Sequence, residues 1–219
     1  MKKIFLGLII LAITSGCGLF HKDTEKTATE LLTEARAEYQ DKDYRDAVEL
    51  FQQLINWYPF SEHVAEAEIK IADAYYEMEK YNEAIRAYNS FERLHPLHPE
   101  AEKASFRIAQ SFYNQIYSID RDQTNTRQAL KHYNRFVKSY PDSKYSKKAE
   151  ENAKDCVKRL AESELYVGNF YLKQEAFEAA EQRFNNIIKN YPETAAAKKA
   201  VKKLEQIANE KEKITNDQE

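Results

Sequence analysis

The sequence predicts an all-α superhelix, a solenoid of stacked antiparallel helix pairs, and three observations support this fold class. One fragment recurs four times at constant spacing: an alanine, an aromatic residue four positions later and a proline eight positions after that. A bulky apolar residue follows each aromatic by three positions, so these residues share one helix face. A small residue precedes the alanine by twelve positions in three copies. The four fragments are Ala47–Phe51–Pro59, Ala84–Tyr88–Pro96, Ala129–Tyr133–Pro141 and Ala180–Phe184–Pro192.

Each copy is predicted to form two helices. The upstream small residues Ala35, Ala72 and Gly168 mark where an antiparallel first helix comes closest to the second. Proline ends the second helix, because it lacks an N–H and disfavours helical geometry in the preceding residue. This helix–turn–helix pattern is that of a tetratricopeptide array. We therefore expect a repeat domain over residues 27–209, with four full helix pairs and a capping helix over 194–209, followed by a disordered tail over 210–219.

Two repeats depart from the common length. Ala109 precedes Ala129 by twenty positions, so repeat three carries an eight-residue insertion near 117–125. Its many hydrogen-bonding groups predict an ordered loop, which is either a tolerated interruption or a contact for a partner. In repeat four, 27 residues separate Pro141 from Gly168, where the two preceding repeats use thirteen. The extra stretch lacks glycine and proline and predicts a first helix of about 28 residues over 144–173.

The N-terminus predicts an export signal over residues 1–16. Two lysines precede an apolar stretch of ten residues, which is too short to span a bilayer. Small residues then lead to Cys17, as in a bacterial lipobox whose cysteine carries diacylglycerol, although Thr14 replaces the usual leucine. The alternative is an ordinary secretory signal with a chance cysteine. With lipidation at Cys17, residues 17–26 form a tether, and Gly18 as the next residue favours the outer membrane.

Composition excludes several classes of function. Removing Lys2 and Lys3 leaves 31 basic against 36 acidic residues, a net charge of −5, which argues against nucleic-acid binding. The folded part has one glycine, Gly168, so phosphate-cradling loops and nucleophile elbows are not expected. Cys156 has no partner for a disulfide and is predicted to pack as a small apolar residue. His95 and His98 lack the further ligands of a metal site. We expect no enzyme activity, no cofactor and no metal.

Polar residues of the first helices that do not fall on the buried helix face predict a binding groove. In such arrays the first helices line the concave face, where tyrosine offers contact area and a hydroxyl to a peptide ligand. The alternative is a hydrated inner wall without a ligand. The residues expected to face the groove are Arg36, Asp73, Tyr76, Gln110 and Asn114.

Three segments at the repeat boundaries resemble one family. They are Tyr58-Pro59-Phe60-Ser61, the stretch Arg93-Leu94-His95-Pro96-Leu97-His98-Pro99, and the run from Asp120-Arg121-Asp122-Gln123-Thr124 to Arg127-Gln128-Ala129-Leu130. In these the chain is similar to the BamD family, the lipoprotein subunits of the β-barrel assembly machinery in the outer membrane of Gram-negative bacteria. The similarity covers essentially the whole mature chain. We expect a departure at the end, where no second helix of repeat five is predicted.

The resemblance implies a lipid-anchored scaffold on the periplasmic face of the outer membrane. C-terminal repeats of this family dock on the membrane-proximal periplasmic domain of BamA, in a complex with other Bam lipoproteins. The N-terminal repeats are thought to receive the aromatic-ended C-terminal signal of unfolded barrel proteins. Carried to this sequence, Arg127 and Arg183 are candidate BamA contacts. The alternative is a periplasmic tetratricopeptide protein of the Tol–Pal and cell-wall type, but no heptads of the expected coiled coil precede Thr27.

Overall fold

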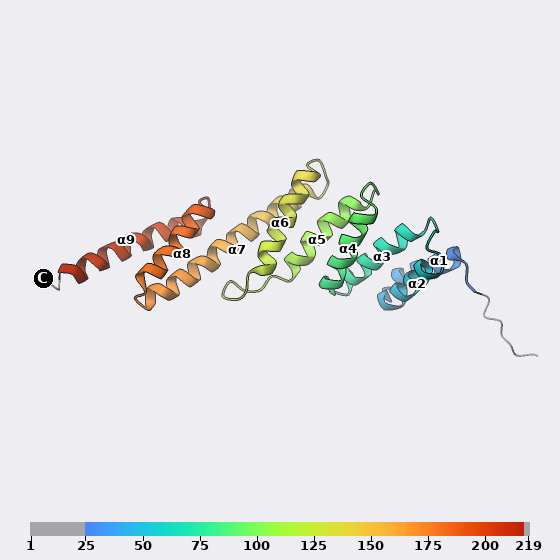
Figure 1. Cartoon of the computed structure of the whole chain (residues 1–219), viewed down its shortest axis with the longest axis horizontal. Helices are drawn as coiled ribbons and strands as arrows, with labels where there is room; N and C mark the ends of the chain where they lie inside the picture. Colours follow the sequence, from blue (N-terminus) through green and yellow to red (C-terminus); the bar gives the residue numbers. More distant parts are fainter. Residues whose placement is uncertain (1–24, 217–219) are drawn as a thin grey trace, which may run out of the picture.

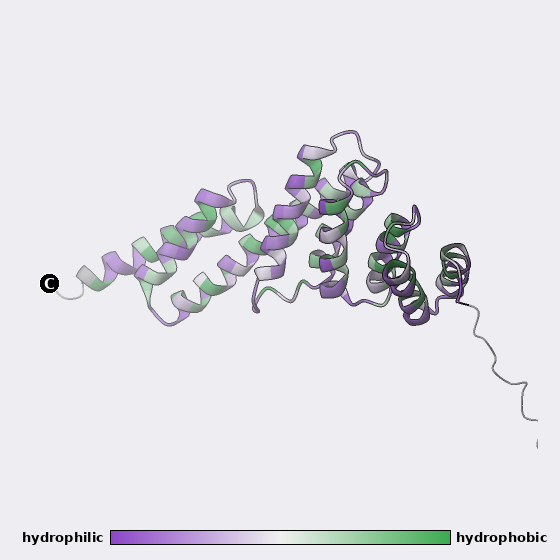
Figure 2. Cartoon of the chain, turned by 45° about the vertical axis from the view of Figure 1, so that its right-hand side comes forward, coloured by the Kyte–Doolittle hydropathy of each residue, from purple (hydrophilic) through white to green (hydrophobic). Residues whose placement is uncertain are grey.

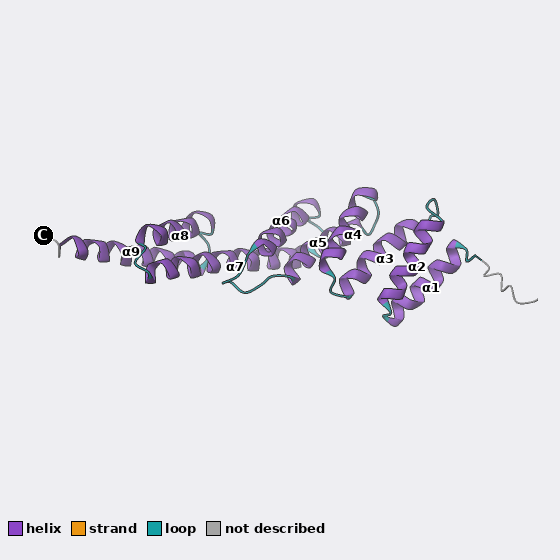
Figure 3. Ribbon diagram, turned by 60° about the horizontal axis from the view of Figure 1, so that its bottom comes forward, coloured by secondary structure: helices purple, strands orange, loops and turns teal. Residues whose placement is uncertain are grey.

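The computed structural model describes residues 25–216, and within that range the chain forms nine α-helices and no strand (Figures 1 and 3). The export signal, Cys17 and residues 17–24 of the tether lie outside the described residues. Within residues 25–216 no helix is both long and apolar enough to span a bilayer. The helices are α1 (Ala28–Asp41), α2 (Tyr44–Trp57), α3 (Val64–Glu77), α4 (Tyr81–Leu94), α5 (Ala101–Asn114), α6 (Thr124–Ser139), α7 (Ser146–Lys173), α8 (Phe177–Asn190) and α9 (Ala195–Asn216).

The helices stack in chain order. Pairs α1/α2, α3/α4, α5/α6 and α7/α8 are antiparallel, each second helix also packs on the first helix of the next repeat, and α9 covers α8 and α7 (Figure 1). The first repeat begins with a capping box, in which Thr27 and Glu30 satisfy each other's backbone N–H groups. The predicted tetratricopeptide superhelix of four helix pairs and a capping helix is therefore confirmed.

The core follows the repeated positions of the sequence. All four repeat alanines, the aromatic residues four positions later and the apolar residues three further are fully buried. Four apolar clusters each combine one helix pair with the next helix along the chain, so the core is continuous. Figure 2 shows hydrophobic and hydrophilic stretches alternating along every helix, as amphipathic packing requires. Cys156 is fully buried, and burial raises the pKa of its thiol to about 12, which confirms its predicted packing role.

Tight turns join the two helices of repeats one, two and four. In each, one residue adopts the left-handed conformation: Lys42 (φ 69°), Glu79 (φ 58°) and Glu175 (φ 57°). The next backbone N–H then donates to a carbonyl in the last helical turn, as Asp43 does to Glu38 at 2.9 Å. This closes the first helix and reverses the chain within two or three residues.

The insertion of repeat three is an ordered loop, as predicted. Gln123 is buried, and its Nε2 donates to the carbonyls of Ser118 (2.9 Å) and Arg121 (3.0 Å). Asn125 Nδ2 donates to the Gln115 carbonyl at 2.9 Å, which ties the loop back to the end of α5. The loop therefore holds itself together without a partner.

The last two long helices differ in how well they were predicted. The 28-residue first helix of repeat four is confirmed as α7. The expectation of a disordered tail from residue 210 is wrong, because α9 continues to Asn216. Ile207 is fully buried, and Lys211 Nζ lies 3.3 Å from Glu178 and 3.0 Å from Glu181 of α8. These contacts hold the last turns of α9 against α8, and residues 217–219 lie outside the described part.

Candidate protein-docking groove

The length of α7 opens a groove between repeats three and four. It has 28 residues, whereas α1, α3 and α5 have 14 each. Fourteen extra residues add about 21 Å of helix. The N-terminal half packs on α6 through Ala149, Ala153 and Cys156, and the C-terminal half packs on α8. The side of α7 between these two contacts is left open.

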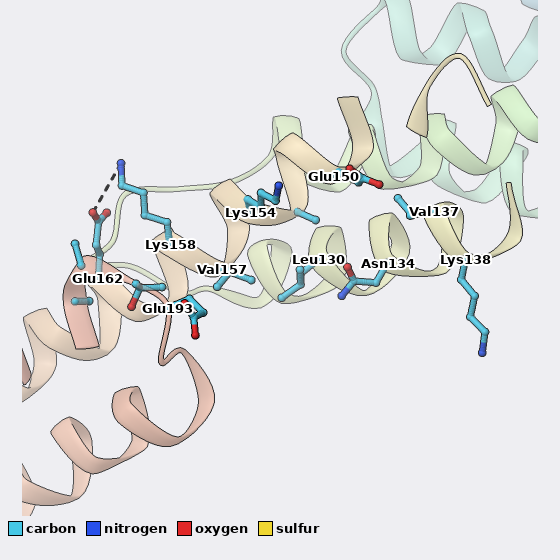
Figure 4. A pocket seen from close by; sticks show the side chains of 14 residues that line it. Leu130, Asn134, Val137, Lys138, Glu150, Lys154, Val157, Lys158, Glu162 and Glu193 are labelled. Carbon is cyan, nitrogen blue, oxygen red and sulfur yellow. Dashed lines mark ion pairs between the residues drawn. The ribbon is translucent and has the colours of Figure 1, made fainter. Parts of the chain in front are cut away.

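This groove has a volume of about 800 Å³ and an apolar floor (Figure 4). Leu130 of α6 and Val157 of α7 point into the same space, and the turn between α8 and α9 closes one end. The apolar lining consists of Leu130, Val137, Ala153, Val157, Ala195 and Ala196. The polar rim consists of Asn134, Lys138, Glu150, Lys154, Lys158, Glu162, Glu193 and Thr194.

Charges of both signs border the apolar floor. Lys158 and Glu162 form an ion pair along α7 at 4.0 Å, drawn as the dashed line in Figure 4. Among residues 25–216, Lys138 and Lys154 have no ion-pair partner, although they face the groove from α6 and α7. An apolar centre with a polar rim is the usual composition of a protein interface.

Neither of the two arginines predicted to bind a partner lines this groove, but each is connected to a helix that does. Arg127 precedes Leu130 by three residues and so lies on the same face of α6. Arg183 of α8 donates to Glu164 of α7 at 3.1 Å, and Glu164 lies two turns beyond Val157 on the same face of α7.

The pKa of Tyr191, at the end of α8, responds to charges on both α6 and α7. Burial raises the pKa of the Tyr191 hydroxyl, the charge of Glu164 raises it further, and Arg127 opposes this rise. Tyr191 is thus within electrostatic reach of both the Arg127 guanidinium and the carboxylate that binds Arg183.

In the N-terminal half, the structure corrects the prediction for Asp73. Only 7% of Asp73 is exposed, so it does not face an open groove. Its Oδ1 accepts from the Tyr88 hydroxyl at 2.7 Å and its Oδ2 accepts from Lys103 Nζ at 2.9 Å. The covering side chains come from α4 and α5, which helical phase alone does not reveal. Asp73 holds three helices together.

Gln110 occupies the same place one repeat later. Its Oε1 accepts from the Tyr133 hydroxyl at 3.0 Å and from Asn152 Nδ2 at 3.2 Å. Its Nε2 donates to Asn114 at 2.9 Å. Gln110 is partly buried, and its polar atoms are already used between repeats three and four.

The remaining predicted groove residues stay accessible. Arg36 of α1 forms a two-point ion pair with Glu66 of α3, at 2.6 and 2.5 Å. Asn114 donates to the Tyr76 hydroxyl at 3.1 Å, and the guanidinium of Arg107 lies 4.0 Å from the centre of the Tyr76 ring. Tyr76, Asn114 and Gln110 therefore form one chain of contacts between repeats two and three, while Arg36 stands apart in repeat one.

The groove residues on α7 and α9 were missed by reasoning from the sequence. The available signal was the extra length predicted for the first helix of repeat four, because a helix that outgrows its partner leaves one side uncovered. No group of three or more histidine, cysteine or acidic side chains able to hold a metal ion occurs in the described part of the chain. The side chains of the groove offer binding through apolar contact and charge.

Comparison with known proteins identifies relatives over most of the chain. The YfiO family, described as outer membrane lipoprotein, matches residues 24–219. The outer membrane protein assembly factor BamD of Neisseria meningitidis serogroup A is 32% identical over 222 residues, covering 94% of this chain and 83% of that protein. BamD of Vibrio cholerae serotype O1 is 35% identical over 82 residues, 37% of this chain and 34% of that protein. A tetratricopeptide repeat protein from Parabacteroides merdae aligns with a TM-score of 0.43 at 16% identity, covering 84% of this chain and 60% of that chain.

Proposed function

The chain belongs to the family of outer membrane lipoproteins that includes the BamD assembly factors, and from this we propose that it is a lipid-anchored periplasmic scaffold of the β-barrel assembly machinery. In this role it binds BamA, works beside other Bam lipoproteins and receives unfolded outer-membrane proteins. The observation that carries the proposal is the open groove along α7, which has an apolar floor and a polar rim. The function is positioning, which needs no covalent step and no cofactor.

The groove along α7 is the proposed BamA site. Its apolar floor offers Leu130 and Val157 to a buried anchor of the partner, and such central apolar contacts carry most binding energy in interfaces. Arg127 is more than half exposed and is 3.9 Å from Asp122, a separation at which a surface ion pair contributes little. Its guanidinium can therefore exchange this contact for a carboxylate of BamA.

The N-terminal half is the proposed site for the substrate's C-terminal segment. Tyr76 offers a half-buried ring, and Asn114 and Arg36 offer accessible polar groups. Asp73 and Gln110 support this surface from behind, since both hold a tyrosine hydroxyl of the second-helix layer. An extended peptide would lie across the first helices of repeats one to three.

The long helix joins these two sites. Its N-terminal half belongs to the core with α5 and α6, and its C-terminal half belongs to the core with α8 and α9. Because one continuous helix carries both packings, a substrate held on the N-terminal repeats keeps a defined position relative to BamA.

Photocrosslinking in living cells tests the BamA assignment. A photoreactive residue at Asn134 in the groove, or at Arg183 beside it, is expected to capture BamA, whereas the same residue at Arg86 of α4, which is well exposed, should not. Capture of a cell-wall enzyme at Asn134 and Arg183 would instead favour the Tol–Pal alternative. Capture of BamA from all three positions would show that the groove has no special role.

The lipid anchor has its own test. Cys17→Ser removes the thiol that would carry the lipid, so we expect the protein to leave the outer-membrane fraction. An unchanged amount in that fraction, with unmodified residue 17 by mass spectrometry, would contradict the anchor.

A further inference from the structure

Four exposed apolar side chains repeat at one edge of the solenoid. Phe60 and Leu97, each directly after a boundary proline, are 101% and 97% exposed. Trp57 and Leu94, each two positions before that proline, are 46% and 53% exposed. The turns that carry them, α2–α3 and α4–α5, both lie along the upper edge in Figure 1. We call Trp57, Phe60, Leu94 and Leu97 the apolar edge.

The fold does not require these side chains. The two later turns of the same kind, α6–α7 and α8–α9, have polar residues at the equivalent positions: Ser139 and Asp142, and Asn190 and Glu193. Those turns close as well as the first two, with the same pattern of backbone hydrogen bonds. Full exposure of a phenylalanine and a leucine at adjacent turn tips therefore indicates an external contact.

The chain enters the first repeat beside this edge. The Tyr58 hydroxyl donates to the Lys26 carbonyl at 2.7 Å, so the start of the described chain is tied to the turn that carries Trp57 and Phe60. Lys26 follows Cys17 by nine positions, a stretch that spans at most about 30 Å when extended. A lipid on Cys17 would hold Lys26, and with it the α2–α3 end of the apolar edge, within that reach of the bilayer.

We propose that the apolar edge inserts into the interfacial layer of the membrane that holds the lipid anchor. This inference rests on the lipid anchor of the proposed function. Tryptophan and phenylalanine are the side chains preferred where protein enters the headgroup region, and leucine adds apolar area. Phe60 and Leu97 lie in two neighbouring turns, and Trp57 and Leu94 lie at the helix ends that lead into them, an arrangement that suits a continuous lipid surface. Insertion fixes which edge of the solenoid faces the membrane, and so directs the remaining surfaces toward protein partners.

Trp57 is the only tryptophan of the chain and reports directly on the contact. The full-length lipidated protein is reconstituted into phosphatidylethanolamine–phosphatidylglycerol vesicles with or without brominated acyl chains. Brominated lipid is expected to quench Trp57 fluorescence. In the double variant Phe60→Ser, Leu97→Ser this quenching should fall at least threefold, with unchanged helical content by circular dichroism.

A matched pair of substitutions serves as the control. Tyr117 and Phe170 are 55% and 56% exposed but lie in the loop after α5 and near the end of α7. Tyr117→Ser with Phe170→Ser should leave Trp57 quenching unchanged. Equal loss of quenching in both double variants would overturn the proposal.

Three further outcomes would also overturn it. The first is absence of quenching in the anchored wild-type protein. The second is undiminished quenching in the double variant with Phe60→Ser and Leu97→Ser. The third is burial of Trp57 only after other Bam subunits are added, because the apolar edge would then contact a protein. Crosslinking of Asn134 to BamA in the same variant separates this inference from the proposed function. If BamA is still captured while Trp57 is not quenched, the scaffold role stands and only the membrane contact fails.

Discussion

The hydroxyl of Tyr88 donates to Asp73 Oδ1 at 2.7 Å, and neither residue is accessible to solvent beyond 7%. Asp73 is the residue directly after Ala72, the buried small residue of repeat two. Repeat three reproduces the relationship with Tyr133 and Gln110 at 3.0 Å. In both repeats, the buried tyrosine of the second helix therefore donates a hydrogen bond to a polar side chain of the first helix.

Repeats one and four show the complementary case. Their aromatic residues are Phe51 and Phe184, which have no hydroxyl to satisfy. Arg36 follows the small residue Ala35 of repeat one and pairs with Glu66 of the next repeat. Asn169 follows the small residue Gly168 of repeat four and lies at the C-terminal surface. Tyrosine thus occurs where the residue after the small residue of the first helix accepts its hydrogen bond, and phenylalanine occurs where that residue does not.

Breaking this pair should destabilise the protein in a coupled way. Asp73→Ala leaves a buried hydroxyl without an acceptor and is expected to lower the free energy of unfolding by about 1–3 kcal/mol. Tyr88→Phe should cost about 1 kcal/mol, because Asp73 keeps Lys103. The double variant should cost less than the sum, as measured by urea unfolding. Tyr117→Phe, at an exposed site, is the control and should change stability by less than about 0.5 kcal/mol. Strict additivity would show that the two groups are independent.

Gly168 should not tolerate a methyl group. A Cβ at this position would lie 2.5 Å from the ring of Phe184, which is fully buried. Alanine gains up to about 1 kcal/mol in helix propensity, but overpacking costs about 1–3 kcal/mol. We expect Gly168→Ala to be destabilising overall, although repeats one to three carry alanine at the equivalent position.

A second substitution checks the cause. If steric overlap with Phe184 is responsible, Gly168→Ala with Phe184→Leu should be more stable than the sum of the two single changes predicts. Thermal unfolding of the four proteins measures this. A Gly168→Ala protein that melts above the wild type would contradict the close approach of α7 and α8.

His132 should make stability fall in mild acid. It stacks on Phe112 with ring centres 5.2 Å apart, and its buried Nδ1 has no hydrogen-bond partner among the described residues. Burial lowers the pKa of His132, the charges of Arg135 and Lys131 lower it further, and Glu92 opposes them. Below the unfolded pKa of about 6.5, the unfolded chain binds the proton more readily than the folded one. Stability is therefore full above that pH and is lost as pH falls toward the folded pKa.

Urea midpoints at pH 7.5 and 5.5 measure this dependence. His132→Phe keeps a ring against Phe112 but cannot bind a proton, so its midpoint should fall less than that of the wild type. An equal fall in both proteins would assign the pH dependence to other groups.

The sequence predicts the repeat core well, because burial there follows a local period. Ala47, Ala84, Ala129 and Ala180 are buried where the spacing places them, and the 28-residue α7 follows from a stretch without helix breakers. Helical phase also places Asp73 on the first-helix layer. It does not reveal that Lys103, 30 residues later, covers that position. Whether a side chain is covered depends on the neighbouring helices, so the prediction that Asp73 faces an open groove was wrong.

The docking groove is harder to predict for the same reason. Leu130, Val157 and Ala195 line one space but come from α6, α7 and α9. Each is unremarkable within its own helix, and only the stacking of two repeats on α7 brings them together. The end of α9 was also misjudged, since its polar composition conceals the contacts of Lys211 with α8.

The most direct test of the scaffold assignment is recovery of BamA from detergent-solubilised outer membranes with Val157→Asp as bait. A carboxylate in the apolar floor must lose its water when BamA docks, and this is costly even where a lysine of the rim can pair with it. The account predicts at least tenfold less BamA than with the wild type, while a bait with Arg86→Asp, far from the groove, recovers it normally. Wild-type recovery of BamA with a correctly folded Val157→Asp protein would contradict it.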